Sequence, residues 1–82
     1  MDLPRILGRN VREKRKRLGK SQEDLALDIG MKRSYLSDLE RGKRNPSIKA
    51  LARLAEALGV EAAALLARPE DDAESDSASH LR

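Results

Sequence analysis

Two helical patterns separated by a break of only a few residues constrain the fold more than any other feature of the sequence. The first pattern covers residues 22–29 and ends at Gly30, and the second covers residues 32–41. Helices joined by a turn this short must cross at close range, which favours small residues such as Ala26 and a glycine that can adopt a left-handed backbone. The second helix is therefore expected to project outward from the body of the protein.

Apolar stripes and capping residues predict three further helices. Apolar side chains recur at helical spacing in residues 3–18, 48–58 and 62–67. The stripe of the first segment runs through Leu3, Leu7, Val11 and Leu18, and that of the second through Ile48, Leu51, Leu54, Ala55 and Leu58. Ser21 and Asp24 have the spacing of a capping box ahead of residue 22, and Ser47 is expected to cap the helix that begins at residue 48.

The composition favours an all-α fold, a compact bundle of five helices. A chain of 82 residues forms one small domain with little room for an enclosed pocket. It contains no Phe, no Trp and one Tyr, so its core must consist of aliphatic side chains, which suit packed helices better than sheets. The absence of Cys excludes disulfides and thiolate metal sites and fits a reducing cytoplasm. We expect no metal, cofactor or catalysis, because the only histidine is His80 and no phosphate-binding glycine loop follows a strand.

Charge is distributed unevenly along the chain. Residues 1–67 hold fifteen Lys and Arg against nine Asp and Glu, whereas residues 68–82 hold two against five. The basic segment predicts a polyanionic partner, with a merely well-solvated surface as the alternative. The acidic segment has too few apolar residues to offset the entropy of folding, so we expect a folded domain at 1–67 and a disordered tail at 68–82. No apolar run approaches the roughly 18 residues of a membrane span, so no membrane partner is expected.

Several short motifs occur in the order of a known family pattern. They are Ser21-Gln22, Leu25-Ala26, Gly30, Leu36, LERG at 39–42, NPS at 45–47 and LARLAEALGV at 51–60. Through them, residues 7–66 resemble the phage-repressor-type helix-turn-helix family, which includes the Cro and CI repressors. The string RSYLSDLERGKRN is similar to the controller proteins of restriction–modification systems. The resemblance implies a lambda-repressor-like domain that regulates transcription. We expect the protein to bind a palindromic site on double-stranded DNA as a homodimer, to need no cofactor, and to be cytoplasmic and nucleoid-associated.

The helix at 32–41 is expected to enter the major groove of DNA. Its candidate base contacts are Arg33, Ser34, Ser37 and Asp38. A guanidinium such as that of Arg33 can donate to both O6 and N7 of guanine, and a hydroxyl can bond several base edges. Asp38 has two interpretations, because its carboxylate can accept from cytosine or brace Arg41 three residues later. An ordinary antiparallel helical hairpin is the alternative for this pair of helices.

A second group of residues is expected to contact DNA phosphates without reading bases. Its members are Gln22, Tyr35, Arg41, Lys43, Arg44 and Asn45. Gln22 lies in the first turn of its helix, where its amide and the free backbone N–H groups can hold a phosphate. The Tyr35 hydroxyl can bond a phosphate, or its ring can be partly buried against the body of the protein. The basic run at 12–17 is interpreted as a solvated helix face, with a nuclear localisation signal and an approach of part of the run to phosphate as the alternatives.

Two expectations concern structural contacts. In the family, an Arg of the first helix pairs with the Glu of the ERG turn, so the resemblance implies an ion pair between Arg15 and Glu40. Dimerisation is expected through the last two helices, where Leu65 and Leu66 look exposed beside an alanine-rich stretch.

Other functions share this fold and remain alternatives. The same domain serves as the antitoxin of toxin–antitoxin pairs, where it binds a toxin and also represses its own operon. RNA polymerase is a further candidate partner for a regulator bound beside a promoter. A protein-binding helical module without specific affinity for DNA is the third interpretation.

Overall fold

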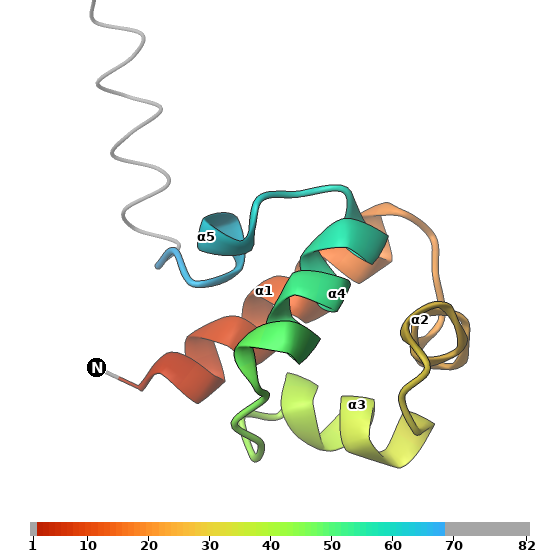
Figure 1. Ribbon diagram of the computed structural model, residues 1–82, viewed down its shortest axis with the longest axis horizontal. Helices are drawn as coiled ribbons and strands as arrows, with labels where there is room; N and C mark the ends of the chain where they lie inside the picture. The colour runs from red at the N-terminus through yellow and green to blue at the C-terminus, as the bar shows by residue number, and fades with distance from the viewer. Residues whose placement is uncertain (1, 69–82) are drawn as a thin grey trace, which may run out of the picture.

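Five α-helices make up the described part of the chain, which in this computed structural model is residues 2–68 (Figure 1). They are α1 (Leu3–Arg17), α2 (Gln22–Ile29), α3 (Arg33–Glu40), α4 (Ile48–Leu58) and α5 (Ala62–Leu65), and no strand occurs in that range. The predicted all-α fold is confirmed, and the predicted ends differ by one or two residues at α1, α3 and α5. The tail predicted at 68–82 lies, apart from Arg68, outside the described residues.

Local interactions at Ser21 and Gly30 fix both ends of α2. The Ser21 hydroxyl accepts a hydrogen bond from the backbone N–H of Asp24 at 3.0 Å, and the Asp24 carboxylate accepts one from the backbone N–H of Ser21 at 3.2 Å. This is the predicted capping box. Gly30 ends the helix with a φ of 66°, a left-handed conformation that glycine adopts without a Cβ penalty. The chain can therefore turn sharply and begin α3 at Arg33.

The core is aliphatic and draws on all five helices. Its fully buried large side chains are Val11, Leu25, Leu36, Leu39, Leu54 and Leu65. Burying one such leucine stabilises the fold by about 1.5–3 kcal/mol relative to leaving it exposed. The predicted stripes fail only at their ends: Leu3, Leu18 and Ile48 lie at or next to helix termini, beyond the packed part of each stripe, and are exposed.

Gly8 allows α1 to pack directly against the end of α3. A Cβ atom at this position would lie 2.3 Å from the backbone carbonyl oxygen of Leu39 and 2.7 Å from that of Glu40. Any side chain here would force the two helices apart. The absence of a side chain at Gly8 therefore lets the C-terminal end of α3 lie directly against α1.

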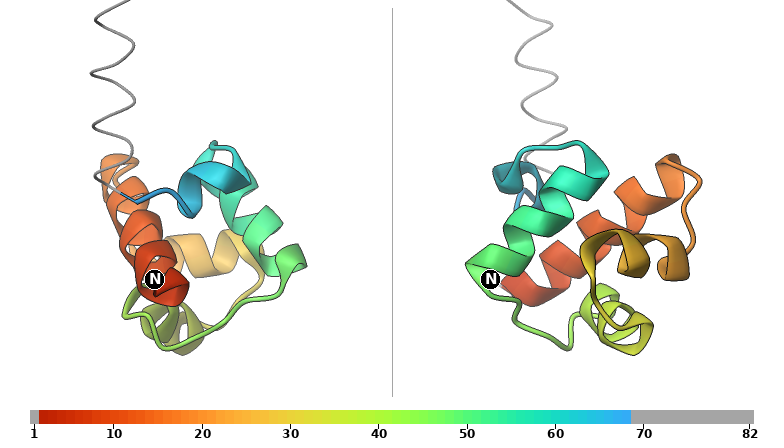
Figure 2. Two further views of the ribbon diagram at one scale, coloured as in Figure 1. Left: turned by 90° about the vertical axis from the view of Figure 1, so that its left-hand side faces the viewer. Right: turned by 45° about the vertical axis from the view of Figure 1, so that its right-hand side comes forward.

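The arrangement of the helices leaves one side of α3 open. α3 packs against α1 and α2, while α4 and α5 pack against each other and against α1. In Figure 1, α3 forms the bottom edge of the molecule. Figure 2 shows from two further directions that no other helix of the described chain covers its outer side.

Candidate nucleic-acid interface

The open side of α3 carries polar side chains. Arg33 and Ser34 are exposed, and Ser37 and Asp38 are partly exposed one turn later. Positions three and four apart lie on the same face of a helix, so these four side chains are neighbours. The opposite side of α3 is held in the core by two fully buried leucines. The four candidate base contacts therefore share the face that points away from the core.

The loop after α3 adds basic and amide side chains to the same edge of the protein. Arg41, Lys43, Arg44 and Asn45 are all exposed. Backbone hydrogen bonds fold this loop against α3, because the carbonyl oxygen of Asp38 accepts from the N–H groups of Arg41 and Lys43 at 3.1 and 2.9 Å. The predicted phosphate contacts of the loop therefore flank the predicted base contacts of the helix.

The Asp38 carboxylate bridges two arginines. Its Oδ1 accepts a hydrogen bond from Arg41 Nη2 at 2.5 Å, and its Oδ2 accepts one from Arg44 Nη2 at 3.4 Å. The hydrogen bond from Arg41 is the main reason why the pKa of Asp38 lies below its ordinary value. The predicted brace between Asp38 and Arg41 is thus confirmed, whereas a base contact from Asp38 stays a prediction.

Tyr35 is partly buried and packs against the core. The guanidinium carbon of Arg44 lies 5.1 Å from the centre of the Tyr35 ring, within the range of a cation–π interaction. Partial burial of the ring, one of its two predicted roles, is confirmed. The phosphate contact of its hydroxyl stays a prediction.

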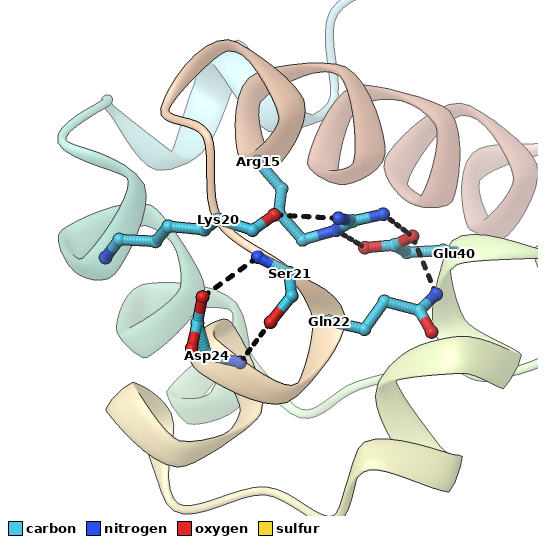
Figure 3. A network of polar contacts seen from close by, with 6 residues as sticks. All are labelled: Arg15, Lys20, Ser21, Gln22, Asp24 and Glu40. Carbon is cyan, nitrogen blue, oxygen red and sulfur yellow. Dashed lines mark hydrogen bonds and ion pairs between the residues drawn. The ribbon is translucent and has the colours of Figure 1, made fainter.

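A buried ion pair joins α1 to the end of α3 (Figure 3). Arg15 donates from Nε to Glu40 Oε2 at 2.7 Å and from Nη2 to Glu40 Oε1 at 2.9 Å, and the two side chains are only 10% and 2% exposed. The hydrogen bonding to Glu40 raises the pKa of Arg15 above its ordinary value. Arg15 Nη1 also donates to the backbone carbonyl oxygen of Lys20 at 2.9 Å. The predicted pair is present and ties the loop between α1 and α2 to the end of α3.

Gln22 joins this network from the first turn of α2. Its Nε2 donates to Glu40 Oε1 at 3.0 Å, and its side chain is partly buried (Figure 3). The buried carboxylate therefore determines where the Gln22 amide points. A phosphate contact from Gln22 stays a prediction, and it would come from the second amide hydrogen or from the backbone of this turn.

The two candidate dimer residues lie in different environments. Leu65 is fully buried in the core, so the prediction that it is exposed is wrong, whereas Leu66 is 36% exposed. Asn10 is itself buried and donates to the backbone carbonyl oxygens of Leu65 and Ala67 at 2.9 and 2.7 Å. A four-residue helix such as α5 has too little periodicity to show its inward side, and its attachment to Asn10 places Leu65 in the core.

Two side-chain contacts beside the candidate interface have no local signal in the sequence. The bond between Arg44 and Asp38 spans six positions, which is not a spacing that brings side chains together on a helix. The bond between Gln22 and Glu40 spans 18 positions and depends on how α2 and α3 pack. Lys32, the N-cap residue of α3, is exposed.

Residues 2–68 lack the features of two other kinds of site. No group of three or more side chains in this range has the arrangement of a metal site. No helix in the same range is long and apolar enough to cross a membrane. An open groove of about 450 Å³ lies between the α2–α3 turn and α4, with Met31, Tyr35 and Arg53 among its lining residues.

The short turn between α2 and α3, with the open helix after it, is the arrangement that defines one large family. Residues 11–65 match the helix-turn-helix family. The chain belongs to this family. A helix-turn-helix transcriptional regulator of Sinorhizobium fredii, uncharacterised so far, is 43% identical over 60 residues, which cover 73% of this chain and 78% of the relative. The control protein C.SmaI of Serratia marcescens is 41% identical over 68 residues, which cover 83% of this chain and 81% of the relative.

Solved structures of helix-turn-helix regulators have the same fold. A hypothetical transcription factor from Neisseria gives a TM-score of 0.85 with 38% identity, covering 89% of this chain and 84% of its own. The restriction–modification controller protein C.Esp1396I, a tetramer in complex with its natural 35 base-pair operator, gives a TM-score of 0.71 with 31% identity, covering 79% of this chain and 86% of its own. By family, this helix-turn-helix chain is a DNA-binding transcriptional regulator.

Proposed function

We propose that this helix-turn-helix protein binds a specific double-stranded DNA site as a homodimer, with α3 of each protomer in the major groove of one half-site. The observation that carries the proposal is the placement of α3, whose polar side is open while its leucines anchor the other side in the core. An α-helix fits the width of the major groove, where its exposed side chains reach base edges. The basic loop beside α3 supplies contacts to the phosphates that border the groove.

Arg33 is proposed as the main base-reading residue. It is the first residue of α3 and is exposed. Its guanidinium can donate to O6 and N7 of one guanine at the same time. Ser34 and Ser37 share its face of the helix and are the further proposed base contacts, whereas the Asp38 carboxylate on the same face is engaged by Arg41 and Arg44. The residues proposed to contact phosphates are Gln22, Tyr35, Arg41, Lys43, Arg44 and Asn45.

A second copy of the chain is proposed to cover an apolar surface at one end of the molecule. Leu66 lines a groove of about 190 Å³ together with Leu3, Pro46 and Leu51, among others. Leu66 and Leu3 are 36% and 45% exposed, and covering them removes apolar area from water. Asn45 lines the same groove. A partner packed here would therefore bring the phosphate-binding loops of the two protomers towards the two-fold axis.

Dimerisation also follows from the small size of the DNA-reading element. An α3 of eight residues reaches only a few base pairs, too few to define a site in a genome. Two copies related by a two-fold axis place their α3 helices about 34 Å apart, one turn of DNA, and read a palindrome. The tetramer that the related C.Esp1396I forms on its operator supports an oligomeric mode of binding.

Two measurements on the full chain test this proposal. Selection from random duplexes is expected to return one motif with two-fold symmetry and half-sites centred about 10 base pairs apart. Sedimentation at micromolar concentration is expected to show a dimer, either alone or on the selected duplex. Recovery of no motif would contradict sequence-specific binding, and a monomer both with and without DNA would contradict the homodimer.

We further propose that the regulated genes belong to a restriction–modification system. The support is the 41% identity to C.SmaI, a control protein, over 83% of this chain. The selected motif is then expected upstream of neighbouring methyltransferase or endonuclease genes, and the protein is expected to protect it in a footprint. Neighbouring genes that encode a toxin would instead favour the antitoxin alternative.

A further inference from the structure

We propose that Asp38 is a positioning residue that sets the specificity of the interface without reading a base. Its carboxylate holds the guanidinium groups of Arg41 and Arg44 in place for the DNA backbone, and its negative charge weakens binding to DNA of arbitrary sequence. This inference rests on the proposed function, because it concerns the side of α3 that faces DNA.

The geometry of the carboxylate separates this role from base reading. Each oxygen of Asp38 accepts a hydrogen bond from a different arginine, Oδ1 from Arg41 and Oδ2 from Arg44. The Asp38 side chain is 29% exposed, against 60% for Arg41 and 49% for Arg44. The Asp38 side chain is therefore less exposed than either arginine, and each of its oxygens is already engaged by one of them. A cytosine amino group would have to share an oxygen with an arginine.

Both arginines stay available to phosphates while Asp38 holds them. A guanidinium has five N–H donors, and Asp38 engages a single nitrogen of each arginine. Arg44 is restrained a second time, by the Tyr35 ring 5.1 Å from its guanidinium carbon. Ordering these long side chains before binding removes part of the entropy cost of forming the complex. The benefit is greatest where phosphates lie at fixed positions, as they do in a complex held in register by base contacts.

The charge of Asp38 mainly weakens binding to DNA of arbitrary sequence. Arg41, Lys43 and Arg44 bring three positive charges to this loop, and Asp38 offsets one of them. Binding to arbitrary DNA depends on how many phosphates the protein neutralises, and each one adds about 0.9 to the slope of log affinity against log salt. Asp38 therefore lowers affinity for arbitrary DNA, while the aligned arginines maintain affinity for the operator.

Two variants and a matched control test the proposal in the full chain. Asp38→Asn removes the negative charge and keeps one oxygen acceptor, whereas Asp38→Ala removes the charge and every side-chain acceptor. The control is Asp28→Asn, because Asp28 also forms a solvent-accessible ion pair, with Lys20 at 2.6 Å, and lines a groove with Arg53 and Glu56 of α4. It loses the same charge away from α3. Circular dichroism and thermal unfolding establish that all three variants fold.

The readouts are affinity for random duplex at several salt concentrations, affinity for the selected operator, and the selected motif itself. Asp38→Asn is expected to bind random duplex more tightly, and the ratio of its affinities at 50 and 200 mM salt is expected to grow about 3.5-fold per protomer. In Asp38→Asn, the preference for the operator over random duplex is expected to fall about three- to tenfold. Asp38→Ala is expected to lose more of this preference. The selected motif is expected to stay unchanged in both variants. Asp28→Asn is expected to match the wild type in every readout.

Three outcomes overturn the inference. A motif that changes at one position in the Asp38 variants would make Asp38 a base-reading residue. An unchanged preference for the operator would remove its role in specificity. An equal effect of Asp28→Asn would mean that the change in binding comes from net charge and not from the position of Asp38. If the wild type selects no motif at all, the proposed function fails, and the random-duplex measurements alone then decide whether Asp38 limits loose binding.

Discussion

Arg15 and Glu40 form a two-point ion pair that joins α1 to the last residue of α3 across 25 positions of the sequence. Gln22 donates to the same carboxylate, so the first turn of α2 is tied to this point as well. The helix that carries the candidate base contacts is therefore fixed at its C-terminal end by a buried charge network as well as by packing.

Removing one partner of this pair should be costly. Glu40→Ala leaves the guanidinium of Arg15 buried without its counter-charge, and such a change destabilises a protein by about 3–5 kcal/mol. Urea unfolding followed by circular dichroism measures this loss. A cost below about 1 kcal/mol would mean that water reaches Arg15 and that the pair does not hold the fold together.

The double variant Arg15→Met with Glu40→Leu is the matched control. Replacing a buried ion pair by apolar side chains of similar volume is often neutral or stabilising. This replacement also takes a donor from the Lys20 carbonyl oxygen, which costs about 1 kcal/mol, while the partly buried Gln22 can turn to water. We expect the double variant to be within about 2 kcal/mol of the wild type and clearly more stable than Glu40→Ala.

Gly8→Ala tests the close contact between α1 and α3. Alanine is favoured over glycine inside a helix by about 1 kcal/mol. The new methyl group, however, would lie 2.3 Å from a backbone oxygen, and overpacking of this kind costs about 1–3 kcal/mol or more. The clash should win, with a net loss of stability and weaker DNA binding. Gly30→Ala is the comparison: it meets no atom within 4 Å, so only its φ of 66° is unfavourable. A Gly8→Ala protein as stable as the wild type would refute the contact.

The helices were predictable from the sequence because their signals are local. The stripe of α2, its capping box at Ser21 and its stop at Gly30 all lie within ten residues, and the structure contains each of them. The resemblance to the family supplied the pairing of Arg15 with Glu40, which no local pattern contains. Contacts between segments without such a precedent were missed, as with the bond from Arg44, in the loop after α3, to Asp38 of α3.

The error at Leu65 has a similar cause. Two adjacent leucines at the end of a short helix give no periodic signal for which of them faces inward. The choice depends on Asn10, more than fifty positions earlier, which bonds the backbone of Leu65. Only the packing of α5 against α1 shows that Leu65 is buried and that Leu66 is left exposed.

Leu66→Asp should weaken dimerisation. A carboxylate in an apolar interface must be desolvated without a partner, which is unfavourable by several kcal/mol. The control is Leu27→Asp, because Leu27 is 76% exposed on α2 and lies outside the groove that Leu66 lines. Sedimentation should show a monomer for Leu66→Asp at concentrations where the wild type and Leu27→Asp are dimers. Equal dimerisation of both variants would place the interface elsewhere.

Lys43→Ala should weaken binding to all DNA sequences alike. An ammonium that contacts only phosphate releases about one counterion, so the salt slope should become shallower by about 0.9 per protomer. Lys16→Ala is the control: Lys16 is exposed near the end of α1, which Figure 1 places far from the loop that follows α3. A steeper loss at the operator than at random duplex would mean that Lys43 reads a base.

The open side of α3 is proposed to read DNA sequence, and selection from random duplexes with Arg33→Ala tests this role most directly. Arg33 is exposed at the start of the helix, and its removal leaves the core untouched. Binding to the wild-type operator is expected to weaken by about 1–3 kcal/mol, and base preference is expected to be lost at one position of each half-site, with the rest of the motif retained. Recovery of the wild-type motif unchanged from Arg33→Ala would contradict this role.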